Sequence, residues 1–344
     1  MTIAPRPSST NLRTARIAAI GVYLPSTIRT TADTEAQLRH LNPGLRIPAG
    51  LVRRLTGVER VFVRGADEQA SDLAVGAALH ALEQSPGDVD LLIFASASQD
   101  LVEPATAHIV AAKLGITPPV MDIKNACNSV LNAIEVANAL ISSGAYRRIL
   151  IASGEGPSTA VRWKLEESAQ FFRAFPGYTM SDAGAALILE AHDDPSVGIQ
   201  SMRFHAVSKH WEVGTLPGGG TWRGHDPEAG YFDMDGTALH RAFLDLGTQP
   251  IHDVLTEQDL TWDDIDLVAI HQVALPFLPE IIRQLGVRSE AIVPLIRDYG
   301  NVASVALPLQ IHLAREQGLV GEGSRILIVG LAGGISMGVA GVVL

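Results

Sequence analysis

The chain has 344 residues, of which 47% are hydrophobic and 18% are charged. This length exceeds one small domain and leaves enough apolar side chains for a large interior, so we expect two domains or two fused halves. A formal net charge of −11 argues against a general nucleic-acid-binding protein, which needs a basic surface for phosphates. Cys127 is the only cysteine, which excludes an intramolecular disulfide.

Residues 1–15 form a lead-in that contains charge, serine, threonine and proline but no apolar stretch typical of a secretory signal. The most apolar run, residues 326–344, is interrupted by glycines and predicts two buried strands rather than a membrane span. We therefore expect a soluble, cytoplasmic protein without membrane insertion.

Short apolar segments typical of buried strands recur along the chain, with helical patterns between them. The predicted strands are residues 16–24, 90–98, 119–125, 147–155, 183–191, 266–274, 291–296, 324–332 and 337–344. The predicted helices are residues 70–85, 104–114, 128–143, 237–256, 276–286 and 303–317. This alternation predicts an α/β fold in which a mixed or parallel sheet is covered on both faces.

The two parts of the chain resemble each other. DLLIFASASQD matches DLVAIHQVALP, and RRILIASGEG matches SRILIVGLAGG. Alignment of these last segments places Cys127 opposite Asn301, within a few residues of loop, and Ala95 opposite His271. We predict two copies of one unit about a pseudo-twofold axis, an N-terminal half at 16–190 and a C-terminal half at 191–344.

This arrangement would bring Cys127, His271 and Asn301 into one crevice, because ligands bind beyond the carboxyl ends of strands, where helices begin. A helix N-terminus lowers the pKa of a thiol, and the same turn offers N–H groups to an oxyanion. We therefore predict a nucleophilic Cys127. Ordinary structural explanations also exist: a buried inert thiol, a core histidine and a helix-capping asparagine.

Six segments, in this order, resemble those of ketoacyl synthase III-type condensing enzymes of the thiolase fold. They are NACNSV, SDAGAALIL, YFDMDGTALHRAF, HQVA, YGNVASVALP and LAGGISMG. The resemblance spans residues 16–344. It implies an α/β thiolase-like fold with two pseudo-symmetric halves in α-β-α-β-α layers, and a homodimer.

The resemblance also implies a mechanism. Cys127 takes an acyl group from a thioester, and the N–H groups of Cys127 and Gly333 form the oxyanion hole. His271 and Asn301 stabilise the enolate left when a malonyl-type thioester loses CO2, and the carbanion attacks the acyl-Cys to give a β-keto product. The substrates would be pantetheine thioesters of coenzyme A or acyl carrier protein, with no permanently bound cofactor.

The chain departs from the family pattern at the segments that bind the substrate carrier. Leu51 and Leu55 stand where the family has an indole and a guanidinium for coenzyme A, and Arg54 is the nearby candidate substrate contact. Ala274 and Pro276 replace an asparagine and a carrier-docking arginine. These departures favour a specialised lipid or secondary-metabolite pathway.

A further departure lies next to the nucleophile, where Asn128 and Ser129 replace a small residue and a glycine. They either bind the substrate or cap the helix. The same Cys–His pair would also support acyl transfer to an alcohol or amine without decarboxylation, with His271 as general base. We expect decarboxylative condensation and keep acyl transfer as the alternative.

Two other segments carry weaker signals. The histidines at 205, 210 and 225, with Glu212, suggest a metal site, but their irregular spacing favours a loop near the tunnel mouth, and we predict no metal. Residues 161–175 are amphipathic, with basic and aromatic side chains. We expect this segment to cover the acyl site or to form a dimer contact.

Overall fold

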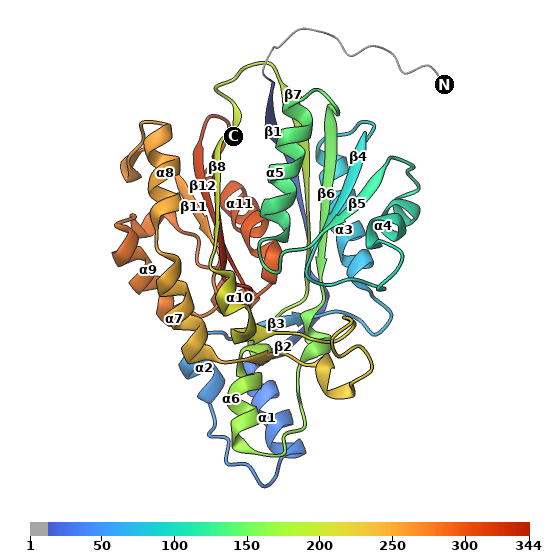
Figure 1. The fold of residues 1–344 in the computed structure, drawn as a ribbon, viewed down its shortest axis with the longest axis vertical. Coiled ribbons are helices and arrows are strands. Elements are labelled where there is room, and N and C mark those ends of the chain that lie inside the picture. The colour runs from blue at the N-terminus through green and yellow to red at the C-terminus, as the bar shows by residue number, and fades with distance from the viewer. Residues whose placement is uncertain (1–12) are drawn as a thin grey trace.

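The structure is a computed structural model that describes residues 13–344, shown as a ribbon in Figure 1. Most of the predicted lead-in, residues 1–12, lies outside the described residues. The first strand, β1, already begins at Thr14, so the end of the predicted lead-in belongs to the fold.

The larger sheet has five strands in the order β1-β7-β6-β4-β5. Its strands are β1 (Thr14–Tyr23), β4 (Leu91–Ala95), β5 (Val120–Ile123), β6 (Arg148–Glu155) and β7 (Ala183–His192). The strands β4, β5 and β6 are parallel, whereas β7 is antiparallel to both β6 and β1. Their continuous apolar sequences arise because helices cover both faces.

The second large sheet has four strands in the order β11-β12-β13-β8. Its strands are β8 (Gly198–Ala206), β11 (Leu267–Ile270), β12 (Arg325–Ala332) and β13 (Ser336–Val343). β11 and β12 are parallel, and β13 is antiparallel to β12 and β8. The sequence analysis did not identify β8, which adds the edge strand next to β13.

Five layers result from the packing of helices on these two sheets, and Figure 1 shows their order. The central layer holds α5 (Ser129–Ser142) and α11 (Ala306–Glu316), and the layer outside the first sheet holds α3 (Ala70–Gln84) and α4 (Thr106–Leu114). The layer outside the second sheet holds α7 (Gly236–Leu246), α8 (Gln249–Glu257) and α9 (Leu278–Leu285). The thiolase-like α-β-α-β-α arrangement is confirmed.

Alternating strand residues face different layers, as the two-residue period of a strand requires. In β6, Ile149 and Ile151 belong to the central core with α5 and α11. Leu150 and Ala152 belong instead to the core formed with α3 and α4. Because both faces are buried, the register of each strand is strongly specified.

The predicted strand at 291–296 is wrong. Ser289–Ala291 form a 3-10 turn, the next residues are irregular, and Ile296–Tyr299 form the short helix α10. The buried amide of Gln272 takes the hydrogen bonds that a neighbouring strand would have taken. It donates to the Val293 carbonyl at 2.9 Å and accepts from the Leu295 N–H at 3.0 Å. The second sheet therefore ends at β11.

Strand register agrees with the predicted alignment of the two halves. Leu91 pairs with Ile149 in the first half, and Leu267 pairs with Ile326 in the second, which matches Ala95 with His271 as predicted. The offset that matches Ile149 with Ile326 places Cys127 opposite Ser304, which lies within the few residues of loop that the predicted match with Asn301 allows.

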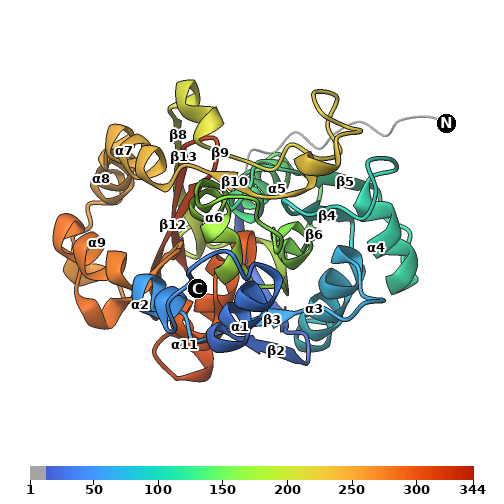
Figure 2. The same ribbon diagram turned by 90° about the horizontal axis from the view of Figure 1, so that it is seen from below.

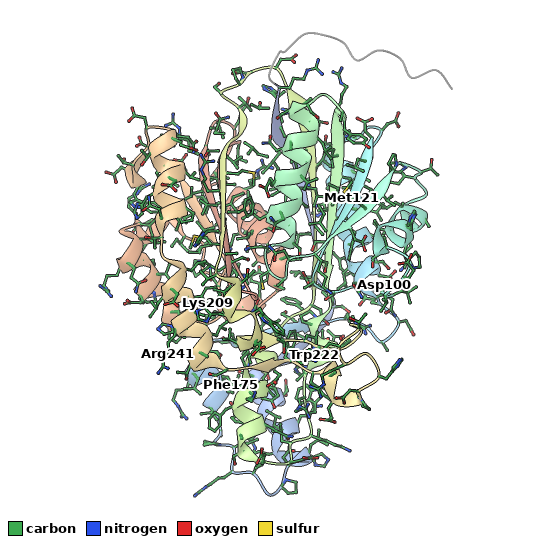
Figure 3. All side chains as sticks on the ribbon, in the orientation of Figure 1. Asp100, Met121, Phe175, Lys209, Trp222 and Arg241 are labelled. Carbon is green, nitrogen blue, oxygen red and sulfur yellow. The ribbon has the colours of Figure 1, made fainter. Side chains whose placement is uncertain are left out.

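An extension lies beyond the carboxyl ends of the parallel strands, and Figure 2 shows it from below. It consists of α1 (Thr31–Leu41), α2 (Leu51–Thr56), the hairpin-like pair β2 (Thr27–Thr30) and β3 (Arg60–Val63), and α6 (Ser168–Ala174) with 3-10 turns at Pro157–Ala160 and Phe175–Thr179. Phe175, which Figure 3 marks in this extension, packs edge-to-face on Phe171. Only α6 of the predicted amphipathic segment 161–175 is an α-helix.

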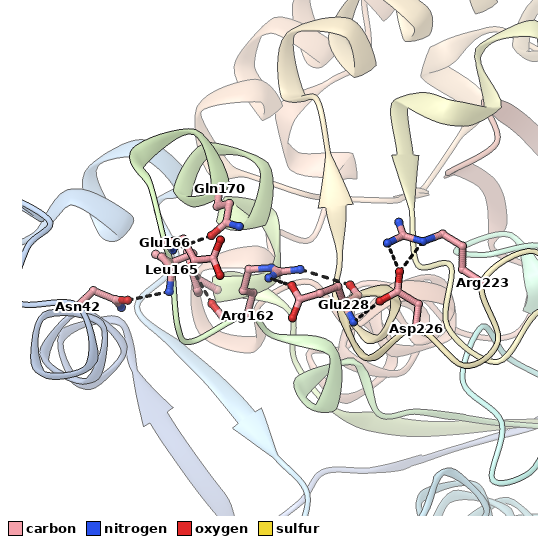
Figure 4. A network of polar contacts seen from close by, with 9 residues as sticks. Asn42, Arg162, Leu165, Glu166, Gln170, Arg223, Asp226 and Glu228 are labelled. Atoms are coloured by element: carbon pink, nitrogen blue, oxygen red, sulfur yellow. Dashed lines mark hydrogen bonds and ion pairs between the residues drawn. The ribbon is translucent and has the colours of Figure 1, made fainter.

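A long segment after β8 runs across this extension. It contains 3-10 turns at Ser208–Val213 and Pro227–Gly230 and the short strands β9 (Gly214–Thr215) and β10 (Asp233–Met234). Figure 4 shows how it is fastened: Arg162 pairs with Glu228, the N–H of Glu228 bonds to Asp226, and Asp226 pairs with Arg223. The predicted helix 237–256 is divided into α7 and α8 at Gly247.

Among residues 13–344, no helix is long and apolar enough to cross a lipid bilayer.

Gly300 and Gly247 provide a matched test of the turn that leads to Asn301. They share one glycine-type backbone conformation, φ 68° and ψ −169° at Gly300 and φ 70° and ψ −171° at Gly247. A Cβ at Gly300 would approach the Thr179 carbonyl oxygen and Val61 Cγ1 to 2.8 Å, whereas a Cβ at Gly247 would meet nothing within 4 Å.

We predict that Gly247→Ala costs backbone strain of about 1–3 kcal/mol, and that Gly300→Ala costs about 1–3 kcal/mol more because of the clash. Urea unfolding of both variants measures the difference. Equal losses would show that the packing around Gly300 does not constrain this turn.

Candidate active site

The ends of several strands bring polar residues together at the extension. β6 ends at Glu155, β11 is followed by His271, and β12 is followed by Gly333. The N–H of His271 donates to the carbonyl of Val329 in β12 at 3.0 Å, which holds the histidine beside that strand end. This is the position at which open α/β sheets bind ligands.

Cys127 lies in a tight turn between β5 and α5. The preceding residue, Ala126, has φ 46°, a left-handed conformation that is unfavourable for a residue with a Cβ. Ser129 stabilises the turn, because its hydroxyl donates to the Ala126 carbonyl at 2.7 Å and accepts from the Asn125 N–H at 2.9 Å. The turn therefore places Cys127 just before α5, which begins at Ser129.

The thiol is held in its neutral form, contrary to the predicted lowering of its pKa. Burial, followed by the nearby Glu155 carboxylate, raises the pKa of Cys127 to about 12. The N–H groups of Cys127 itself and of Gly333 act in the opposite direction, as the helix-terminus argument predicted, but their effect is smaller. Gly333 thus faces the sulfur with its N–H group.

His271 is also neutral. Its side chain is 4% exposed, and burial lowers its pKa to about 4. Its Nδ1 atom has no hydrogen-bond partner among the described residues. A buried ring nitrogen without a partner is unusual in a purely structural histidine, and a neutral imidazole can accept or donate a proton at physiological pH.

Both backbone groups of Asn301, its N–H and its carbonyl, are hydrogen-bonded. Its N–H donates to the Thr179 carbonyl at 2.9 Å, and its carbonyl accepts from the Ser181 N–H at 3.0 Å. Its side-chain Oδ1 accepts from the Ala303 N–H at 3.0 Å, which stabilises the 3-10 turn Ala303–Val305 before α11. The Asn301 oxygen is therefore used locally, and its Nδ2 group is the part available for a ligand.

Asn128 and Ser129 have structural partners. Asn128 stands at the N-cap position of α5, but its side chain makes no capping hydrogen bond, so the predicted capping role is wrong for this residue. Its Nδ2 donates instead to Ser336 Oγ at 3.1 Å, across the two halves. Both side chains are fully buried, and Ser129 braces the Cys127 turn.

Arg54 lies on α2 at the surface, where none of the described residues forms an ion pair with it. α2 lies beside the segment that follows His271, since Gly57 at its end packs against the Leu275 side chain. Within residues 13–344, the structure assembles no group of three potential metal ligands, and His210 bonds to Asp245 at 2.9 Å.

The sequence analysis missed three residues at this end of the sheets. Gln272 holds the 291–296 segment in place of a strand, and Glu155 and Ser304 form a buried hydrogen bond of 2.5 Å. A carboxylate that ends the apolar segment ILIASGE was a usable signal for Glu155. The role of Gln272 depends on contacts of its side chain with residues about twenty positions away, which no local sequence pattern indicates.

Comparison with known families agrees with this geometry. Residues 121–208 match the model of 3-oxoacyl-[acyl-carrier-protein] synthase III, and residues 255–344 match the model of its C-terminal part. Together the two matches cover just over half of the chain. The chain belongs to the ketoacyl synthase III family. It is a condensing enzyme of the acyl-cysteine type that this family represents.

Individual relatives extend over nearly the whole chain. The β-ketoacyl-[acyl-carrier-protein] synthase III of Clostridium perfringens is 27% identical over 337 residues, which cover 96% of this chain and 99% of the relative. The synthase III of Neisseria gonorrhoeae is 28% identical over 329 residues, which cover 94% of this chain and 97% of the relative.

Solved structures show the same fold. A variant of Xanthomonas campestris OleA aligns with a TM-score of 0.87 at 20% identity, over 97% of this chain and 99% of OleA. The 3-oxoacyl-[acyl-carrier-protein] synthase III of Aquifex aeolicus aligns with a TM-score of 0.82 at 24% identity, over 96% of this chain and 100% of that chain. The ketoacyl synthase III fold is thus shared along nearly the full length.

The buried neutral His271 predicts a dependence of stability on pH. Below its ordinary pKa of 6.5 the unfolded chain takes up a proton that the folded chain, with a pKa of about 4, does not. Folded-state stability is therefore lost as pH falls from about 6.5 to about 4, and the loss reaches about 2 kcal/mol at pH 5.

The variant His271→Gln should lack this component, so its free energy of unfolding should fall about 2 kcal/mol less than that of the wild type between pH 8 and pH 5. Urea unfolding at both pH values measures it, with His252→Gln, an exposed position on α8, as the control. A parallel fall in the wild type and His271→Gln would contradict a buried, neutral imidazole.

Proposed function

We propose that the protein condenses an acyl thioester with a malonyl-type thioester, with loss of CO2, to form a β-keto product. The observation that supports this most directly is membership of the ketoacyl synthase III family together with Cys127, His271 and Asn301 at one end of the two sheets. We propose the same two halves, divided between residues 190 and 191, and a cytoplasmic setting.

In the first step, Cys127 attacks the thioester carbonyl of the acyl donor. The bond between its sulfur and the acyl carbon forms, the bond to the pantetheine sulfur breaks, and the thiol proton passes to the leaving thiolate. His271 can take part in this proton transfer because burial keeps its imidazole neutral and its Nδ1 has no hydrogen-bond partner among the described residues. The N–H groups of Cys127 and Gly333 stabilise the oxyanion, consistent with their direction toward the sulfur.

In the second step, the malonyl-type thioester loses CO2. The electron pair of the broken carbon–carbon bond stays with the thioester and forms an enolate. Asn301 Nδ2 and an imidazole N–H of His271 donate to the enolate oxygen. This role fits Asn301 because Ala303 occupies its Oδ1 atom. The enolate carbon then attacks the acyl-Cys carbonyl, the new carbon–carbon bond forms, and Cys127 leaves as a thiolate that takes up a proton.

The substrates proposed are thioesters of coenzyme A or acyl carrier protein, with no permanent cofactor. Arg54 is suited to a phosphate of the pantetheine arm, because it is exposed and α2 lies beside the segment after His271. A cysteine-to-serine variant of Xanthomonas campestris OleA has been crystallised with bound lauric acid and lauroyl-CoA. The departures at Leu51, Leu55 and Ala274 support a specialised lipid or secondary-metabolite pathway.

A homodimer through β5 is part of the proposal. This strand is the outer edge of the first sheet, and among the described residues it pairs only with β4. An edge strand with free backbone groups is a template for a second strand. Met121 of β5, marked in Figure 3, is half-buried in the single chain and would be covered in such a pair.

A second candidate is acyl transfer from Cys127 to an alcohol or amine. The neutral imidazole of His271 favours it, since a neutral base can take the acceptor proton. Here no CO2 is released. Of the two candidates to bind such an acceptor, Ser129 braces the Cys127 turn and Asn128 Nδ2 bonds to Ser336, whereas the buried Asn128 Oδ1 has no partner among the described residues.

Asn301→Ala separates the two functions. Without its Nδ2 donor the enolate is less stable, so release of CO2 from a malonyl thioester should fall about 10²–10³-fold, whereas acylation of Cys127 should change little. The assay follows labelled CO2 from malonyl-CoA or malonyl-acyl carrier protein after exposure to an acyl-CoA panel. Acylation of Cys127 in the same sample is the internal control, and Cys127→Ala is the blank for it.

Condensation is contradicted if the acylated wild type releases no CO2 from either malonyl thioester. Discharge of the acyl-enzyme by an added alcohol or amine would then establish acyl transfer. Equal CO2 release by the wild type and Asn301→Ala would exclude Asn301 from the reaction.

A further inference from the structure

Gln310 of α11 carries a buried amide that the proposed mechanism does not use. The residue is 0% exposed. Its Oε1 accepts from the Ile270 N–H at 3.2 Å, and its Nε2 donates to the carbonyls of Ile270 and Ala306, both at 2.9 Å. Burial of an amide is unfavourable unless its hydrogen bonds are made, so these contacts hold the Gln310 side chain in one position.

A second buried amide, that of Gln272, meets Gln310. Gln272 Nε2 donates to Gln310 Oε1 at 3.1 Å and to the Val293 carbonyl at 2.9 Å. Its Oε1 accepts from the N–H groups of Leu295 at 3.0 Å and Ile296 at 3.3 Å. Each of the two amides thus makes four hydrogen bonds, which is the full capacity of a side-chain amide. Neither has a hydrogen bond left for a substrate, so both act on the structure.

The two glutamines bracket His271 in the chain. The Ile270 carbonyl that binds Gln310 belongs to the peptide bond between Ile270 and His271, and the N–H of that same bond donates to the Val329 carbonyl of β12. In the part of the chain that the structure describes, β11 pairs only with β12. Gln310 therefore takes the place of a further strand and ties the peptide unit of His271 on its free side.

The same pair of amides reaches the segments on both sides of Asn301. Gln272 accepts from the N–H of Ile296, where α10 begins, and α10 ends two residues before Asn301. Gln310 donates to the carbonyl of Ala306, where α11 begins, directly after the turn that the Asn301 side chain stabilises. The backbone at His271 and the segments that flank Asn301 are thus fastened to one another.

Apolar side chains serve the neighbouring positions of α11. Leu309 and Ile311 are both buried in apolar cores. An apolar side chain at position 310 would fill space in the same way but would remove the hydrogen bonds of the Ile270 N–H and carbonyl. Because buried backbone groups without partners are unfavourable, the amide of Gln310 contributes to the position of the strand end and not only to packing.

We propose that Gln310 is a positioning residue for the reaction: its amide, together with that of Gln272, holds the backbone at His271 in a fixed place relative to the segments that carry Asn301. This rests on the proposed roles of His271 and Asn301 as donors to the enolate oxygen. Gln310 itself touches no substrate. Its effect arises because the stabilisation that a donor gives to developing charge depends strongly on where the donor is held.

The imidazole signal of His271 tests this without any substrate. The full-length protein is labelled with 13C at histidine Cε1, and His271→Gln identifies the His271 signal by its loss from the NMR spectrum. Gln310→Met keeps an unbranched side chain of similar length but removes the amide. The His271 signal should move by more than its linewidth in Gln310→Met, while the other histidine signals serve as the internal reference.

Gln84→Met is the matched control. Gln84 ends α3, and its Nε2 donates to the carbonyl of Ile20 in β1 at 2.8 Å, so it is also a helix glutamine that binds a strand. Its replacement should leave the His271 signal in place. A signal that moves equally in Gln84→Met and Gln310→Met would show a general loss of packing and would count against Gln310.

The CO2-release assay adds the effect on the reaction. Gln310→Met should lower kcat about 10-fold to 100-fold and change KM for the malonyl thioester less than about three-fold, because the loss is one of alignment in the transition state. Gln84→Met should follow the wild type. If the wild type releases no CO2, the proposed function fails, whereas the His271 signal still decides whether Gln310 holds the histidine.

A folded Gln310→Met whose His271 signal coincides with that of the wild type would overturn the proposal. If circular dichroism shows that Gln310→Met does not fold, Gln310→Asn decides instead. This variant keeps an amide but is one methylene shorter, so the amide no longer reaches Ile270 in the same geometry. The His271 signal should again move, and an unmoved signal in Gln310→Asn would reject the role of Gln310.

Discussion

Burial of α5 and α11 between the two large sheets is the constraint on which the site depends. Both helices contribute apolar side chains to one core with β1, β6 and β12. Strands that are parallel within each half end toward the same extension, so the residues that start the central helices are brought to those strand ends. The packing of the core thus explains why Cys127, His271 and Asn301, the residues proposed for catalysis, follow strand ends or begin helices at the same end of the two sheets.

The same burial determines the charges in the site. Removal from water keeps the thiol of Cys127 and the imidazole of His271 neutral, and it outweighs the N–H groups that favour a thiolate. A site without resident charge suits a reaction in which negative charge develops on a substrate oxygen, because fixed N–H donors stabilise that charge strongly when water is excluded. Glu155 is the exception, and its donors come from both halves.

Sequence patterns predicted the parts of this structure that repeat along the chain. Strands such as 147–155 and 183–191 are continuous apolar segments, so their positions and the match of Ala95 with His271 could be inferred. The segment 291–296 is also apolar but is not a strand, because the Gln272 side chain takes its backbone hydrogen bonds. The hydrogen bond from Asn128 to Ser336, which replaces the predicted cap, depends on contact between distant segments, and the raised pKa of Cys127 depends on burial; local sequence encodes neither.

The most direct test of this account is the mass of the peptide that contains Cys127 after the protein is incubated with a panel of acyl-CoA and acyl-carrier-protein thioesters. The account predicts an added acyl group on that peptide, discharged by a thioester acceptor, and no addition to the corresponding peptide of Cys127→Ala. Absence of acylation across the panel in the folded wild-type protein would contradict an acyl-cysteine enzyme.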